Sequence, residues 1–216
     1  MTLDDLRSAL HGLTLRQTIQ LWHECEQFED GVRQLCLADR YYLLVRACGR
    51  VDALHQWLFD RCREVEAAPD DHLDLWAREH YKSTIITYAG AIQALLTDPE
   101  ITIGIFSHTR PIATKFLRQI KLELERNRLL QTSFLDVLYT SPERESPRWS
   151  EQNGIVVKRR SNPKEATVEA WGLVDGQPTS AHFGLRIYDD VVTRESVTTP
   201  EQIEKTTGAW ELSDNL

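Results

Sequence analysis

The sequence predicts an α/β protein in which a parallel β-sheet is flanked by helices and preceded by a helical region. Three observations lead to this fold class. Helical periodicity fills the chain to about Ala68, strand-like and helix-like runs alternate from His72 onward, and 41% of the 216 residues are hydrophobic, enough for a sizeable core. Strands that alternate with helices are typical of a parallel sheet with helices packed on its faces.

The N-terminal region, residues 1–68, contains three helix-like runs that make up the first predicted domain. "TLRQTIQLWHECEQF" begins at Thr14, a suitable N-cap, and "VRQLCLADRYYLLVRACG" ends at Gly49, a suitable C-cap. Each helix needs an apolar face, and helical spacing predicts one on the first run and one on "VDALHQWLFDRCREVEA". The predicted face residues are Leu15, Ile19 and Trp22 on the first run, and Leu54, Leu58, Cys62 and Val65 on the other.

The second predicted domain, residues 69–216, begins after the turn "APDDH". Runs of β-branched and apolar residues predict strands, and 3.6-residue periodicity predicts helices. Thr199 before Pro200 predicts the N-terminus of the last helix. In chain order we expect a strand at 72–77, a helix at 82–96, a buried strand at 101–108, a helix at 112–127, a loop at 139–154, antiparallel strands at 155–160 and 166–174, a strand at 183–190 and a helix from 200.

Charge and cysteine content exclude several classes of protein. The net charge is −8, whereas a protein that simply coats nucleic acid is basic, so any contact with DNA is local or transient. The four cysteines form no Cys-x-x-Cys pair, which favours reduced thiols over a zinc site built with His23 or His55. No run approaches the roughly 20 apolar residues of a membrane span, and the acidic N-terminus is not a signal peptide.

The tripeptide Lys82-Ser83-Thr84 lies between the predicted strand and helix, where a phosphate-binding loop would end. Lysine at this point can reach the β- and γ-phosphates of a nucleotide, the following hydroxyl can bind Mg²⁺, and the helix N-terminus favours negative charge. Such loops normally use glycine to curl the backbone, but Glu79 and Tyr81 occupy those positions. The alternative reading is a surface lysine that opens a helix.

The stretch "LRIYDDVVT" puts Asp189 and Asp190 at the end of an apolar strand. Hydrolases with a parallel sheet need a carboxylate there for Mg²⁺, and a second one can activate the attacking water. Open α/β sheets bind ligands at the carboxyl ends of their strands, where both motifs are predicted to lie. The alternative is a solvated acidic turn, since aspartate is common in turns.

Three segments resemble the large terminase subunit of tailed bacteriophages, a DNA-packaging motor with an N-terminal ATPase domain and a C-terminal nuclease domain. The resemblance runs from Tyr41 to Leu216 and is weaker before it. Its segments are "LHQWLFDRCREVE", "HLDLWAREHYKSTIITYAGAIQALLTDPEITIGIFSHTRPIA" and "NPKEATVEAWGLVDGQPTSAHFGLRIYDDVVTRESVTTPEQIEKT". The family's loop is often Arg-Gly-x-Gly-Lys-Ser-Thr. Arg78, Lys82, Ser83 and Thr84 match this pattern, while Glu79 and Tyr81 depart from it.

The resemblance implies a P-loop ATPase that binds ATP through residues 78–84, including His80, and needs Mg²⁺. It implies a Walker A role for Lys82 on the phosphates and for Ser83 on Mg²⁺, and a Walker B role for Asp189 on the same ion. Asp190 stands where many relatives have the catalytic glutamate, and Arg78 would sense the γ-phosphate. Arg110 and Arg194 are both candidates for an arginine acting in trans.

The resemblance also implies partners and a place of action. The partners are ATP, double-stranded DNA, the phage portal and the small terminase subunit, with a homo-oligomeric ring for the full-length protein. The place is the host cytoplasm, transiently at the procapsid portal, and no membrane is involved. Relatives place a strand that follows the Asp-Asp motif between the loop strand and the Asp-Asp strand. Only about 26 residues follow Asp190, so we expect an incomplete sheet, little ATPase and no nuclease in this chain.

Two other functions remain open from the sequence. One is another P-loop ATPase acting on nucleic acid, such as a helicase, which would need a strand-separating element. The other is a non-catalytic module with a degenerate loop, for which Glu79 and Tyr81 are the best support. The basic run "VKRRSNPK", residues 157–164, is either a DNA-facing patch or, as we favour, a solvated hairpin tip.

Overall fold

The computed structural model describes residues 2–68, 72–77, 79–178 and 180–216. The chain forms two compact units. Unit 1 comprises residues 1–97 and 127–135, and unit 2 comprises residues 98–126 and 136–216. Among the described residues, no helix has both the length and the apolar character needed to cross a membrane.

Unit 1 is helical, as predicted for the N-terminal region. The Thr14 cap is confirmed: its side chain accepts a hydrogen bond from the backbone N–H of Gln17, and the Gln17 side chain accepts one from the backbone of Thr14. Gly49 ends the second run with a φ of +66°. The elements are α1 (Leu3–Leu10), α2 (Leu15–Cys25), α3 (Gly31–Ala38), α4 (Arg40–Tyr42), η1 (Leu43–Ala47), η2 (Val51–Ala53), α5 (Gln56–Ala67), η3 (Thr84–Ala89), α6 (Gly90–Thr97) and α8 (Arg128–Ser133).

The apolar faces of these helices differ slightly from the predicted stripes. Trp22, Leu58 and Cys62 are buried as expected, but Leu54 is 52% exposed. The reason is that α5 begins only at Gln56, so Leu54 lies in the preceding turn and not on the helix. The four cysteines are free thiols.

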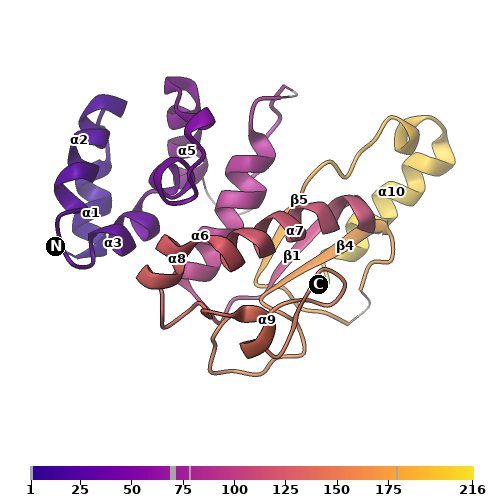
Figure 1. Ribbon diagram of the computed structural model, residues 1–216. Coiled ribbons are helices and arrows are strands. Elements are labelled where there is room, and N and C mark those ends of the chain that lie inside the picture. The colour runs from indigo at the N-terminus through magenta and orange to yellow at the C-terminus, as the bar shows by residue number, and fades with distance from the viewer. Residues whose placement is uncertain (1, 69–71, 78, 179) are drawn as a thin grey trace. The chain divides into compact units, whose positions relative to one another are not determined.

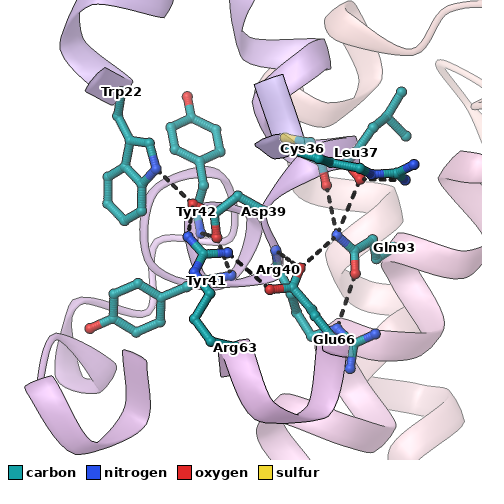
Figure 2. Close-up of polar contacts among 11 residues, drawn as sticks. Trp22, Cys36, Leu37, Asp39, Arg40, Tyr41, Tyr42, Arg63, Glu66 and Gln93 are labelled. Carbon is teal, nitrogen blue, oxygen red and sulfur yellow. Dashed lines mark hydrogen bonds and ion pairs between the residues drawn. The ribbon is translucent and has the colours of Figure 1, made fainter. Parts of the chain in front are cut away.

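A buried polar network joins the helices of unit 1 (Figure 2). Asp39 is fully buried and accepts hydrogen bonds from the Trp22 indole at 2.8 Å and from Arg63 at 2.9 Å. It also accepts from the backbone N–H groups of Tyr41 and Tyr42 in α4. Glu66 of α5 accepts a hydrogen bond from the backbone N–H of Arg40. Gln93 of α6 accepts one from the Arg40 guanidinium at 3.0 Å. The network therefore connects α2, α4, α5 and α6.

Unit 2 contains a five-stranded sheet with the order β2-β3-β4-β1-β5. The strands β1 (Ile103–Thr109), β4 (Val168–Asp175) and β5 (Leu185–Tyr188) are parallel, with β1 between the other two. The short strands β2 (Trp149–Ser150) and β3 (Gly154–Ile155) continue the sheet in antiparallel pairing. The α/β class is thus confirmed, but the sheet is mixed and not purely parallel.

Helices cover this sheet. In Figure 1, α7 (Arg110–Arg126) runs along β1 and β4, which it contacts. Its buried residues repeat at helical spacing: Ala113, Leu117, Ile120 and Leu124. A second apolar cluster joins Phe106, Phe183 and Tyr188, and Trp210 of α10 (Pro200–Ser213) packs on Tyr188 at 4.3 Å between ring centroids. Thr199 caps α10 as predicted.

Two of the predicted strands differ in the structure. The segment 72–77 is irregular and not a strand, and Leu73 and Leu75 are 75% and 85% exposed. A strand needs a hydrogen-bonded neighbour, and none of the described strands pairs with this segment. The predicted antiparallel pair is confirmed only at Ile155 opposite Val168. The loop 139–154 holds β2 and a short helix, α9 (Pro142–Glu145), and η4 (Glu195–Val197) precedes α10.

Candidate nucleotide site

The loop before η3 holds two non-glycine residues in the left-handed region of backbone conformation. Glu79 has a φ of 65° and Tyr81 a φ of 61°, both in the left-handed region that glycine normally occupies. These are the two positions where the resembled motif has glycine. Glu79 and Tyr81 therefore differ from the motif in residue type, but their φ angles are of the kind that glycine adopts.

The helix that follows begins directly after Tyr81. Lys82 and Ser83 are helical, and the backbone N–H of Ile85 donates to the Tyr81 carbonyl at 2.9 Å. Lys82, Ser83 and Thr84 thus form the first turn of this helix. The next turns are π-helical from Thr84 to Ala89, a form that is frequent at functional sites. Arg78 lies outside the described residues.

Side chains upstream in the chain hold this loop in unit 1. The Tyr81 hydroxyl donates to Asp52 at 2.9 Å. The His80 ring lies edge-on to the Trp57 ring, with 5.3 Å between the ring centroids. The ring centroids of Trp57 and Trp76 are 5.6 Å apart. Trp57 is therefore placed beside the loop, whereas Phe59 of the same helix is 3% exposed and packs on Tyr41 in the core.

The acidic pair in unit 2 follows β5, as predicted. Asp189 is 2% exposed, and its backbone N–H donates to the Phe106 carbonyl at 2.8 Å, so the ladder with β1 continues to this residue. Asp190 is exposed and has a φ of 51°. The two carboxylates thus differ in environment: the first is buried against the sheet, and the second faces solvent from a strained turn.

The end of β1 adds polar groups next to Asp189. Phe106 stacks on Tyr188 on one face of the sheet, and side chains alternate along strands, so Ser107 and Asp189 share the opposite face. Ser107 is fully buried and its hydroxyl has no hydrogen-bond partner among the described residues. His108 follows, and its buried Nδ1 is likewise without one. Sequence reasoning missed both residues, although a polar pair ending a buried strand was a usable signal.

The acidic end of β5 offers carboxylate oxygens, which are a ligand type that Mg²⁺ uses in proteins. The described residues contain no cluster of three or more His, Cys, Asp or Glu side chains that could hold a metal. Mg²⁺ is usually held by one or two carboxylates together with waters and substrate phosphates. Asp189 offers such a carboxylate, and the Ser107 hydroxyl on the same face of the sheet can bond to a coordinated water.

The basic residues considered earlier are partly engaged within unit 2. Arg110 donates to the Gln152 carbonyl at 2.6 Å, and its guanidinium lies 4.6 Å from the Trp171 ring centroid. Arg194 is exposed. In the run 157–164, Arg159 donates to the carbonyls of Pro163 and Glu165. This inward contact holds the turn together, which favours a structural role for at least that arginine.

Residues 79–84 belong to unit 1, and Asp189 and Asp190 belong to unit 2. No family model matches this chain, and no curated protein is detectably related to it.

Proposed function

We propose that this protein is a Mg²⁺-dependent ATP hydrolase whose phosphate-binding loop is residues 79–84 and whose acidic pair is Asp189 and Asp190. One observation carries the proposal. In the described part of the chain, the three non-glycine residues with positive φ are Glu79, Tyr81 and Asp190. All three lie in the two motifs that the sequence picked out for nucleotide chemistry.

Backbone strain of this kind is costly and therefore informative. A side chain held in the left-handed region costs about 1–3 kcal/mol and persists only where the surroundings impose it. Such residues cluster at ligand clamps and active sites. Both motifs are defined by residue type and not by backbone angle, so the positive φ angles within them are independent support for a binding role.

The roles of the residues follow from their chemistry. The Lys82 ammonium would neutralise phosphate charge while the N–H groups of the first helical turn donate to phosphate oxygens. Mg²⁺, when bound, supplies further neutralisation of that charge. Ser83 and Asp189 would hold it, and the exposed Asp190 carboxylate would accept a proton from the attacking water.

The extension to DNA packaging depends on the resemblance to large terminase subunits. We propose that ATP hydrolysis by this chain serves the translocation of double-stranded DNA through a phage portal, in a ring of copies and with a small terminase subunit. Stimulation of ATP turnover by duplex DNA and portal would support this role. Unwinding of a DNA duplex would instead favour a helicase-like ATPase.

The test uses three substitutions and two matched controls. Lys82→Ala should weaken the binding of ATP, measured by calorimetry, by tenfold or more. Asp189→Asn should weaken the Mg²⁺-dependent part of that binding. Asp190→Asn should bind ATP within about twofold of wild type and, with duplex DNA and portal present, release phosphate about 10²–10⁴-fold more slowly.

The controls carry the same chemical changes at exposed positions. Lys115→Ala removes an exposed lysine of α7, and Asp175→Asn changes an aspartate that also ends a parallel strand but has a 71% exposed side chain. Both should match wild type. Equal ATP affinity in wild type and Lys82→Ala would contradict the proposal. Lys82-dependent binding with no phosphate release, even with DNA and portal, would identify a non-catalytic nucleotide module.

A further inference from the structure

We propose that Tyr81 is a positioning residue: by bonding to Asp52, its side chain holds the glycine-free loop in the left-handed shape that receives phosphate. The inference rests on the proposed function, because it assigns a role within the same loop. It explains how a loop can dispense with glycine at its two turning points. It also brings into the site a residue, Asp52, that lies 30 positions before Lys82 and belongs to no sequence motif.

The anchor is a charge-assisted hydrogen-bond chain within unit 1. The Tyr81 hydroxyl donates to Asp52 Oδ2 at 2.9 Å. Arg50 holds the same carboxylate in a two-pronged contact, with Nε–Oδ1 at 2.9 Å and Nη2–Oδ2 at 2.8 Å. The Arg50 guanidinium also lies 5.8 Å from the centroid of the Tyr81 ring. Arg50 thus fixes the orientation of the Asp52 carboxylate that accepts the hydrogen bond from Tyr81.

The base of the anchor is fastened to the core. Asp52 lies in η2, and the carbonyl of the next residue, Ala53, accepts a hydrogen bond at 3.0 Å from the hydroxyl of Tyr41. Tyr41 is fully buried. The backbone N–H of His55 donates to the same hydroxyl at 3.0 Å. The segment that carries Asp52 is therefore held in place by hydrogen bonds to a buried residue, so Asp52 is a fixed acceptor for Tyr81.

The physical reason for such an anchor is preorganisation. Non-glycine residues favour negative φ, so an unanchored loop with Glu79 and Tyr81 would relax away from the strained conformation. A hydrogen bond to an ionised acceptor is stronger than a neutral one and selects one conformation of the loop. A loop that is already shaped before the phosphates arrive loses less conformational freedom on binding.

The first experiment measures ADP affinity by calorimetry, using the full chain with Mg²⁺. Tyr81→Phe keeps the ring and removes only the hydroxyl, and Asp52→Ala removes its acceptor. Each should weaken ADP binding by about three- to tenfold, the range expected for the net contribution of one typical hydrogen bond. Because both substitutions remove the same hydrogen bond, the double variant should bind ADP about as tightly as the single variant that has the lower affinity. Tyr139→Phe, the same change on a tyrosine of unit 2, should bind as wild type does.

The second experiment tests the anchor without nucleotide. The bond to Asp52 raises the pKa of the Tyr81 phenol above its ordinary value, and that shift should disappear in Asp52→Ala. NMR of ring-labelled tyrosine, assigned with Tyr81→Phe, reads this titration directly. A wild-type Tyr81 that titrates normally would overturn the anchor itself.

The two experiments separate failure of the anchor from failure of the proposed function. If Lys82→Ala loses ADP binding but Tyr81→Phe and Asp52→Ala match wild type, the positioning role is wrong and the nucleotide site stands. If wild type binds no nucleotide, both proposals fall. If the losses of ADP binding free energy in the two single variants add fully in the double variant, the two substitutions have separate effects. That result would also overturn the anchor.

Discussion

At the scale of single residues, the backbone strain at Glu79 should have a measurable effect on the free energy of unfolding. Glycine at position 79 would remove the side-chain clash of a positive φ, worth about 1–2 kcal/mol, while adding about 0.5–1 kcal/mol of unfolded-chain entropy. We therefore expect Glu79→Gly to leave the free energy of unfolding unchanged or raise it by up to about 1 kcal/mol, measured by urea denaturation. The comparison is Glu64→Gly within α5, which should lower it by about 1 kcal/mol. Equal losses in both variants would contradict a strained Glu79.

At the scale of elements, the polar network decides how the helices of unit 1 pack, and Glu66 gives it a pH dependence (Figure 2). Burial, reinforced by the charge of Asp39, raises the pKa of Glu66, although Arg40 and Arg63 oppose the shift. A folded-state pKa above the unfolded one means that the contribution to stability is greatest at low pH and is lost as pH rises through the folded-state pKa. Glu66→Gln keeps an acceptor for the Arg40 N–H but does not titrate. The free energy of unfolding of wild type minus that of Glu66→Gln should therefore fall as pH rises above the unfolded pKa of about 4.3.

Glu66→Ala is the control for the network, because it removes the acceptor as well as the charge. It should lower the free energy of unfolding by about 1–3 kcal/mol at every pH, the cost of a buried donor left without a partner. A difference between wild type and Glu66→Gln that stays constant or rises over pH 4–8 would show that Glu66 does not have a raised pKa.

At the scale of the whole molecule, the division into two units predicts separate local stabilities. Weakening the polar network with Glu66→Ala should increase amide hydrogen exchange in α2, α4, α5 and α6 of unit 1. The amides of β1 and β4 in unit 2 should keep their protection, because their hydrogen bonds and packing lie within unit 2. Hydrogen-exchange mass spectrometry with peptides from both units measures this. An equal loss of protection in β1 and β4 would show instead that the two units unfold as one cooperative structure.

Local signals were enough to predict many of the elements. The caps Thr14 and Thr199 bond to the N–H groups three residues ahead of them, and such contacts depend only on neighbours in the chain. The apolar runs of β1 and β5 and the amphipathic pattern of α7 predicted those elements in the same way. The placement of Asp189 and Asp190 directly after β5 followed from the strand prediction.

The sequence by itself therefore determined the α/β class, the helical N-terminal region and the residues of both motifs. Only the tertiary structure decided that 72–77 is not a strand, because a strand forms only where another strand pairs with it, and such pairing is not encoded by neighbouring residues in the chain. It alone also showed the positive φ of Glu79 and Tyr81 and the bond from Tyr81 to Asp52. The physical reason is that strain is sustained only by contacts that surround it, and those contacts join residues 29 positions apart, which no local pattern records.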